Sequence, residues 1–225
     1  MHQEVEKILA NIEKVMIGKR EVAELSLTAL LAKGHVLLED VPGVGKTMMV
    51  KSLAKSVGLQ FKRIQFTPDL LPSDVVGVSI YNPSTMQFEF RPGPLLGNII
   101  LADEINRTSP KTQSALLEGM EEASVTIDGN TIEIPKPFFV MATQNPIEYE
   151  GTYPLPEAQL DRFLMYVKIQ HPDIESERKI LKLVQGEEKK EKGTPFHKIR
   201  QSVIFEAREA VLNVYMSPEI EEYII

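Results

Sequence analysis

The residues of this chain with the clearest chemical potential lie in a glycine-containing loop, Asp40-Val-Pro-Gly-Val-Gly-Lys-Thr47. The loop stands between a short apolar run, His35-Val-Leu-Leu38, and a helix predicted over residues 46–56. Backbone N–H groups at a helix N-terminus bind phosphate, a lysine reaches the terminal phosphates, and a Ser or Thr hydroxyl coordinates magnesium. The loop therefore predicts a site for a nucleoside triphosphate, ATP with its product ADP, together with Mg²⁺.

The loop departs from the usual phosphate-binding pattern, G-x-x-x-x-G-K-[ST], because Asp40 stands where the first glycine is expected. The change affects the first turn and leaves the phosphate-binding N–H groups in place. An ordinary strand-to-helix turn is the alternative, and the flanking strand and helix argue against it. Lys46 would reach the β- and γ-phosphates, and the Thr47 hydroxyl would coordinate magnesium. The candidate nucleotide-binding residues of the loop are Pro42, Gly43, Val44, Gly45, Lys46, Thr47 and Met48.

A pair of acidic residues, Asp103 and Glu104, follows the continuous apolar run 97–102. Such a run is typical of a strand buried on both faces of a parallel sheet, and ligands bind at the carboxyl ends of such strands. Asp103 would hold magnesium directly or through water, and Glu104 would polarise the attacking water as a general base. The alternative is an acidic strand end that caps the next loop.

Two more polar residues, Asn145 and Arg162, could complete a site. Asn145 follows a strand predicted over 138–142, so its amide could orient the lytic water or contact the γ-phosphate, although Asn-Pro also favours a plain turn. Arg162 could pair with Asp161 or Glu157, or reach the γ-phosphate bound by a neighbouring subunit as an arginine finger. The residues alone favour the salt bridge.

Composition excludes several other functions. The chain has 225 residues, a net charge of −7 and no cysteine, so disulfides, thiolate zinc sites and cysteine nucleophiles are ruled out. The acidic balance, without a basic cluster, argues against nucleic acid as the main partner. No apolar run of about 18 residues and no signal-peptide core are present, so we expect no membrane insertion and a cytoplasmic location. The four histidines lack metal-ligand spacing, and His35 is expected to be packed or at a sheet end instead of catalytic.

Five apolar runs alternate with segments of helical spacing, a pattern typical of a mostly parallel sheet covered on both faces. The strands are expected at 35–38, 61–66, 97–102, 138–142 and 164–169, and the main helices at 19–33, 46–56 and 110–121.

Two β-hairpins are expected to interrupt this α/β scheme. The first pairs residues 75–79 with 87–90. The second pairs 124–127 with 131–134 around Asp128-Gly-Asn130, a strong hairpin signal.

The pattern becomes helical after residue 171. A helix is expected near 175–184, and Ser217-Pro218 opens another. We therefore expect an α/β nucleotide-binding core over 1–171 and a partial all-α domain over 172–225.

Together these blocks resemble the MoxR family of AAA+ ATPases over nearly the whole chain. The residues that carry the resemblance are Gly34-His-Val-Leu-Leu-Glu-Asp-Val-Pro-Gly-Val-Gly-Lys-Thr47, Arg63-Ile-Gln-Phe-Thr-Pro-Asp-Leu-Leu-Pro-Ser-Asp74, Phe88-Glu-Phe-Arg-Pro-Gly-Pro94, Leu101-Ala-Asp-Glu-Ile-Asn-Arg107, Ala142-Thr-Gln-Asn-Pro-Ile-Glu148 and Glu157-Ala-Gln-Leu-Asp-Arg-Phe163.

The resemblance implies an AAA+ P-loop core whose five strands lie in the order 5-1-4-3-2, followed by an all-α lid. It implies that Ile17 and Gly18 lie near the adenine, that Asn145 is the sensor 1 residue, and that Arg162 is the arginine finger. The two hairpins resemble the family's insertion in helix 2 and its hairpin before sensor 1, which would face a central pore or a substrate. Arg107 receives no firm role.

The family also carries a sensor 2 arginine in the lid, within a Ser-Pro-Arg type motif. Ser217-Pro218 is followed by Glu219, and no other segment after Ile169 matches the motif. We therefore expect the lid to be incomplete and ATP binding to be better supported than efficient turnover.

The function implied is an oligomeric ATPase, a hexameric ring in the simplest case, that remodels client proteins in the manner of a chaperone, alongside proteins with a von Willebrand A domain. The alternatives are a nucleic-acid motor, a magnesium chelatase-like subunit and a nucleotide-regulated binding module with little hydrolysis. Turnover stimulated by DNA would favour the motor. Oligomerisation driven by ATP without phosphate release would favour the binding module.

Overall fold

The computed structural model describes residues 2–16, 18–39, 45–145, 151–169, 177–178 and 197–225. Its centre is a five-stranded sheet in the order β2-β5-β8-β1-β9, with every neighbouring pair parallel. Read from β9 and numbered within the sheet, this is the predicted order 5-1-4-3-2, which is confirmed. The strands are β1 (Val36–Glu39), β2 (Phe61–Gln65), β5 (Ile99–Asp103), β8 (Phe139–Gln144) and β9 (Met165–Lys168).

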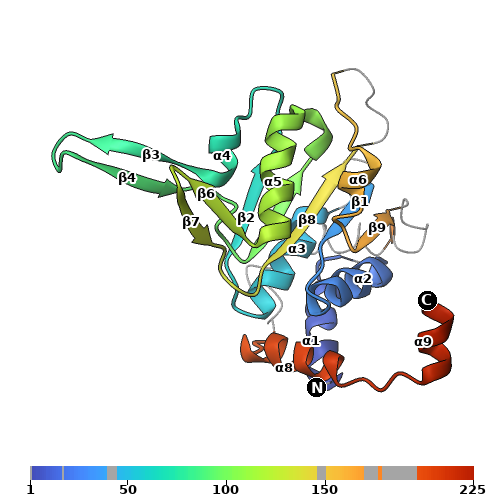
Figure 1. Ribbon diagram of the computed structural model, residues 1–225. Helices are drawn as coiled ribbons and strands as arrows, with labels where there is room; N and C mark the ends of the chain where they lie inside the picture. The colour runs from blue at the N-terminus through green and yellow to red at the C-terminus, as the bar shows by residue number, and fades with distance from the viewer. Residues whose placement is uncertain (1, 17, 40–44, 146–150, 170–176, 179–196) are drawn as a thin grey trace.

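Helices cover both faces of this sheet, because its central strands bury side chains in both directions (Figure 1). In β5, Ile99 and Leu101 join one apolar cluster, whereas Ile100 and Ala102 join the other. The first cluster takes residues from α1 (His2–Glu13), α2 (Arg20–Leu31) and α3 (Lys46–Ser56), and the second takes residues from α4 (Pro72–Val76) and α5 (Pro110–Glu122).

Helix α1 is an element that the sequence analysis did not predict. Its buried residues, Ile8, Leu9, Asn11 and Ile12, form a narrow stripe on an otherwise polar segment. The Asn11 amide donates to Ser56 Oγ at 2.9 Å and to the His197 carbonyl at 2.8 Å. The stripe is stable because α3 and the segment near His197 cover it, and that tertiary contact is invisible in the local pattern.

Both predicted hairpins are present, as β3 (Gly77–Asn82) with β4 (Gln87–Pro92) and β6 (Ser124–Ile127) with β7 (Asn130–Glu133). The β3–β4 hairpin projects away from the sheet (Figure 1). Its first strand begins two residues later than predicted, because residues 75 and 76 end α4. Gly77 has φ 113°, and a Cβ there would lie 2.5 Å from the Arg91 carbonyl oxygen, so the helix stops and the strand starts at this glycine.

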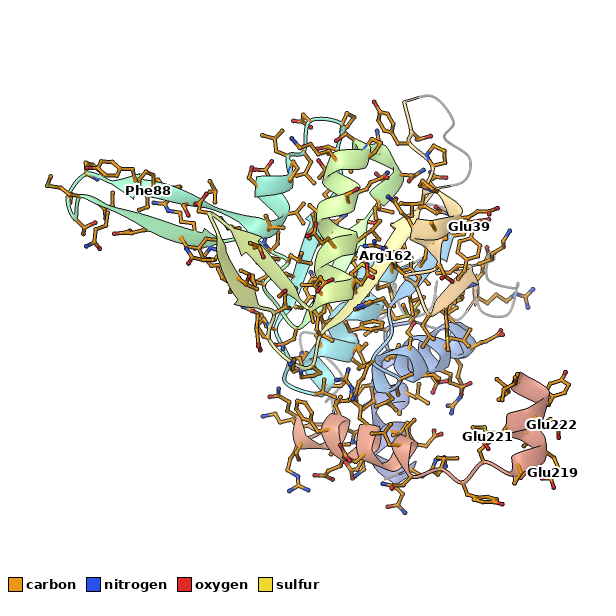
Figure 2. The ribbon with its side chains drawn as sticks, in the orientation of Figure 1. Glu39, Phe88, Arg162, Glu219, Glu221 and Glu222 are labelled. Atoms are coloured by element: carbon orange, nitrogen blue, oxygen red, sulfur yellow. The ribbon has the colours of Figure 1, made fainter. Side chains whose placement is uncertain are left out.

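The C-terminal segment contains α8 (Ser202–Leu212) and α9 (Pro218–Ile224). Val203 and Ile204 of α8 belong to the same apolar cluster as α1 and α2, and Arg208 Nη2 donates to the Leu30 carbonyl at 2.8 Å. Helix α9 begins after Ser217 as predicted and has no buried residue. Its acidic side chains Glu219, Glu221 and Glu222 are exposed (Figure 2). The helix predicted over 175–184 falls almost entirely outside the described residues, and the boundary at 172 stays a prediction.

None of the helices described is long and apolar enough to cross a membrane.

Candidate nucleotide site

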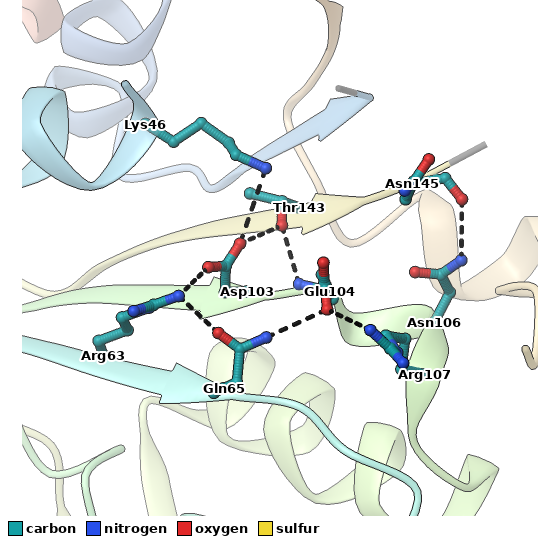
Figure 3. Close-up of polar contacts among 9 residues, drawn as sticks. All are labelled: Lys46, Arg63, Gln65, Asp103, Glu104, Asn106, Arg107, Thr143 and Asn145. Carbon is teal, nitrogen blue, oxygen red and sulfur yellow. Dashed lines mark hydrogen bonds and ion pairs between the residues drawn. The ribbon is translucent and has the colours of Figure 1, made fainter. Parts of the chain in front are cut away.

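The predicted lysine and the predicted acidic pair meet at the carboxyl edge of the central strands. Lys46 is the first residue of α3, Asp103 is the last of β5, and Lys46 Nζ lies 3.7 Å from Asp103 Oδ1 (Figure 3). The Asp103 side chain is 10% exposed, so its charge requires cationic or hydrogen-bonding partners. An ammonium and a carboxylate held together beside a helix N-terminus can bind a phosphate and a cation at one place.

Within the described residues, the end of the loop is Gly45, which leads directly into α3. Gly45 precedes α3 with φ 84°, a left-handed conformation that favours glycine. Thr47 and Met48 lie in the first turn of the helix, with Met48 51% exposed. Gly18 has φ 73°. The other predicted nucleotide contacts, Ile17, Pro42, Gly43 and Val44, lie outside the described residues.

Glu104 has an unusual backbone conformation for a residue with a side chain, φ 58° and ψ 49°. Left-handed backbone at a non-glycine residue costs free energy and is often found at functional sites. Its amide donates to Thr143 Oγ1 at 2.8 Å, and the Thr143 hydroxyl donates to Asp103 Oδ1 at 2.8 Å. One buried hydroxyl therefore ties the two acidic residues together.

Thr143 is a site residue that the sequence analysis missed. It is fully buried in β8, two positions before Asn145. Side chains alternate along a strand, so positions 143 and 145 share a face, and this spacing was the available signal.

Strand β2 supplies two more residues that were not predicted to lie in the site. Gln65 pairs in register with Asp103, and Arg63 lies two positions earlier on the same face. Arg63 Nη2 donates to Asp103 Oδ2 at 2.6 Å, and Gln65 Nε2 donates to Glu104 Oε2 at 3.1 Å. Arg107, which had no assigned role, donates to the same Glu104 oxygen from Nη1 at 3.1 Å. These contacts are drawn in Figure 3.

Asn145, the predicted sensor, lies directly after β8 at this edge and is 7% exposed. Its carbonyl accepts from Asn106 Nδ2 at 3.2 Å, and the Asn106 carbonyl accepts from the Tyr153 amide at 2.7 Å. Asn106, in the short helix η1 (Ile105–Arg107), thus forms hydrogen bonds with the backbone of both Asn145 and Tyr153.

Arg162 is not part of this cluster of contacts. It follows α6 (Glu157–Leu160), and its Nη2 lies 2.9 Å from Glu121 Oε2 of α5. The predicted salt bridge therefore forms with a distant residue instead of Asp161 or Glu157. Asp161 and Glu157 lie one and five positions before Arg162, so their side chains do not face it on a helical turn. Helix α5 packs close enough for its Glu121 to contact Arg162. The pair borders a hollow of about 290 Å³.

The side chains near Asp103 fit magnesium better than a transition metal. Within the described residues, no group of three or more His, Cys, Asp or Glu could enclose a metal ion. Magnesium usually binds one or two protein oxygens and completes its shell with phosphates and water. The Thr47 hydroxyl and the Asp103 carboxylate are such oxygens, so the donor set fits Mg²⁺ held jointly by protein and nucleotide.

Comparisons with known proteins point in the same direction. Residues 35–165 match the model of the ATPase family associated with various cellular activities (AAA). The chain is 62% identical to the protein YeaC of Bacillus subtilis (strain 168), covering 100% of this chain and 70% of that protein. It is 51% identical to the protein named Chaperone MoxR1 of Mycobacterium tuberculosis over 79% of this chain and 47% of that protein.

A 2.00 Å crystal structure of a candidate ATPase from Cytophaga hutchinsonii superposes with a TM-score of 0.87 at 43% identity. The match covers 99% of this chain and 67% of that one. The chain thus spans less than half of MoxR1 and about two thirds of the other two relatives.

Proposed function

Because this chain belongs to the MoxR family of AAA+ ATPases, we propose that it binds ATP with Mg²⁺ and hydrolyses it to remodel client proteins. The observation that carries the proposal is the ion pair between Lys46, at the N-terminus of α3, and Asp103, which Thr143 links to Glu104. Any one of these residues has a structural alternative. Their convergence at the edge of a parallel sheet where ligands bind supports the nucleotide site over those alternatives.

Each residue has a distinct proposed role. Lys46 holds the β- and γ-phosphates, while Thr47 and Asp103 hold magnesium, which neutralises phosphate charge. Glu104 accepts a proton from the attacking water while the oxygen of that water bonds to the γ-phosphorus and the bond between the γ-phosphorus and ADP breaks. Asn145, held by Asn106, orients that water or the γ-phosphate.

We further propose that the complete catalytic unit is a ring, a hexamer in the simplest case. In one chain, Arg162 pairs with Glu121. An arginine that stabilises the transition state must reach the γ-phosphate, and a neighbouring subunit can supply it in trans. A closed ring gives every site such a neighbour.

The client is proposed to be a protein. One relative is named a chaperone, and the β3–β4 hairpin carries exposed apolar side chains, including Met86 at 77% and Phe88 at 73% exposure. Phe88 is labelled on the projecting hairpin in Figure 2. The β6–β7 segment carries Asp128 and Glu133 without Lys or Arg, which disfavours a nucleic-acid motor. A von Willebrand A domain protein is the client class that we propose to test first.

The test uses two variants with a matched control for each. We expect Lys46→Ala to abolish binding of a fluorescent ATP analogue, whereas Lys51→Ala, an exposed lysine of the same helix, binds normally. We expect Glu104→Gln to bind ATP and release no phosphate, whereas Glu21→Gln behaves as the parent chain.

Unchanged phosphate release by Glu104→Gln would overturn the general-base assignment. ATP-driven oligomerisation of the parent chain without phosphate release would instead support the nucleotide-regulated binding module.

A further inference from the structure

A second chain of contacts runs from the metal-binding carboxylate to the general base through strand β2. Arg63 Nη2 contacts Asp103 Oδ2 at 2.6 Å and Gln65 Oε1 at 2.5 Å. Because the Gln65 oxygen faces the guanidinium, its amide nitrogen is left to donate to Glu104 Oε2 at 3.1 Å. Asp103 and Glu104 are therefore linked through Arg63 and Gln65 as well as through Thr143 (Figure 3).

The two oxygens of Asp103 have different partners. Oδ1 faces Lys46 at 3.7 Å and the Thr143 hydroxyl at 2.8 Å, whereas Oδ2 faces Arg63. The Arg63 side chain is 46% exposed and that of Asp103 only 10%. Arg63 thus neutralises a nearly buried carboxylate while about half of its own side chain faces solvent.

A divalent cation at Asp103 changes this balance. It places positive charge within a few ångströms of a guanidinium that competes for the same carboxylate, and the two cations repel each other. Arg63 must therefore weaken cation binding, and cation binding must in turn weaken the contact between Arg63 and Asp103.

We propose that Arg63 is a positioning residue that occupies Asp103 in the metal-free state and releases it when magnesium binds. Release of Arg63 removes the hydrogen-bond donor to Gln65 Oε1. The Gln65 side chain is then free to reorient, which changes its hydrogen bond to Glu104. Metal binding at Asp103 thereby changes the contacts of the general base, Glu104, through Arg63 and Gln65 of β2. The inference rests on the proposed role of Asp103 in holding magnesium.

The experiment measures metal binding without turnover. Mn²⁺ serves as the probe in the presence of ADP, and electron paramagnetic resonance measures the free ion. We expect Arg63→Gln to tighten Mn²⁺ binding roughly ten-fold, because one nearby positive charge is lost. Arg63→Lys keeps the charge and should stay close to the parent chain. Arg91→Gln, an exposed arginine on the projecting hairpin, is the matched control and should leave Mn²⁺ affinity unchanged.

Kinetics supply a second measurement. In Arg63→Gln, the Mg²⁺ concentration for half-maximal turnover should fall, because metal binds more tightly, whereas kcat at saturating Mg²⁺ should stay close to that of the parent chain, in which magnesium also releases Arg63. A purely structural lesion would raise the Mg²⁺ requirement. Unchanged or weakened Mn²⁺ binding in Arg63→Gln overturns the inference.

Asp103→Asn separates this failure from failure of the proposed function. If Asp103→Asn weakens Mn²⁺ binding and Arg63→Gln does not tighten it, only the role of Arg63 is wrong. If Asp103→Asn leaves Mn²⁺ binding unchanged, the magnesium site itself is wrong, and the inference fails with it.

Discussion

At the scale of single residues, the candidate catalytic residues are held in place by hydrogen bonds from neighbouring polar side chains. Thr143 bridges Asp103 and Glu104, Asn106 holds the chain at Asn145, and Arg107 contacts Glu104. A positive φ at Glu104 costs free energy. The Thr143 hydroxyl, which accepts a hydrogen bond from the Glu104 N–H, helps to stabilise this backbone conformation.

Removing the Thr143 hydroxyl tests this directly. Thr143→Val keeps the shape of the side chain but leaves the part-buried Glu104 amide without this partner. Such a loss costs about 1–3 kcal/mol, so we expect a lower free energy of unfolding in urea and a lower kcat. Thr143→Ser retains the hydroxyl and is the control. Equal stability and equal kcat in the two variants would show that the hydroxyl is dispensable.

At the scale of elements, the site is held by contacts between strands and the helices that cover them. His35, directly before β1, is 7% exposed and links two neighbours. Its Nδ1 accepts from the Val140 amide at 3.0 Å, and its Nε2 lies 3.3 Å from the Met120 carbonyl of α5. This arrangement requires a neutral ring protonated at Nε2, since Nδ1 is an acceptor. The prediction that His35 is packed is consistent with its position here.

The neutral state of His35 makes stability depend on pH. Burial lowers its pKa from 6.5 to about 4, with smaller effects from Met120 and Arg208. Between these values the unfolded chain binds more protons than the folded chain, so the free energy of unfolding rises with pH. The contribution is complete above pH 6.5 and is lost as pH falls toward 4, to a limit of about 3 kcal/mol.

Urea unfolding from pH 7.5 to 4 checks this expectation against His35→Gln. Glutamine can donate and accept but does not titrate in this range, so its stability should vary less with pH. Parallel pH profiles for the two chains would refute the assignment.

At the scale of the whole molecule, the residues proposed for catalysis lie in two separate places on one chain. Lys46, Asp103 and Glu104 converge within it, whereas Arg162 contacts Glu121 elsewhere on the surface.

Mixing inactive variants tests the shared site. Glu104→Gln and Arg162→Ala should each lack turnover. In random mixed rings at equal amounts, about a quarter of the sites combine an intact Glu104 with an intact neighbouring Arg162, so activity should return to about that fraction. Arg178→Ala, an exposed arginine, is the control and should keep full activity alone. Absence of recovery in mixtures that assemble would contradict a site completed in trans.

Much of this molecule is determined by local sequence. The apolar runs of β5 and β8, the glycine and lysine before α3, and the proline after Ser109 set elements whose type and order follow from side-chain periodicity and backbone preference. The positions of Lys46, Asp103 and Glu104 at the carboxyl edge of the sheet were predictable for that reason, whereas the sheet order followed from the resemblance to the MoxR family. Contacts between distant segments decided three features that the local pattern did not predict: helix α1, the start of β3, and the pairing of Arg162 with Glu121. So did the participation of Arg63, Gln65 and Thr143, because only the register of β2, β5 and β8 brings these polar side chains to one point.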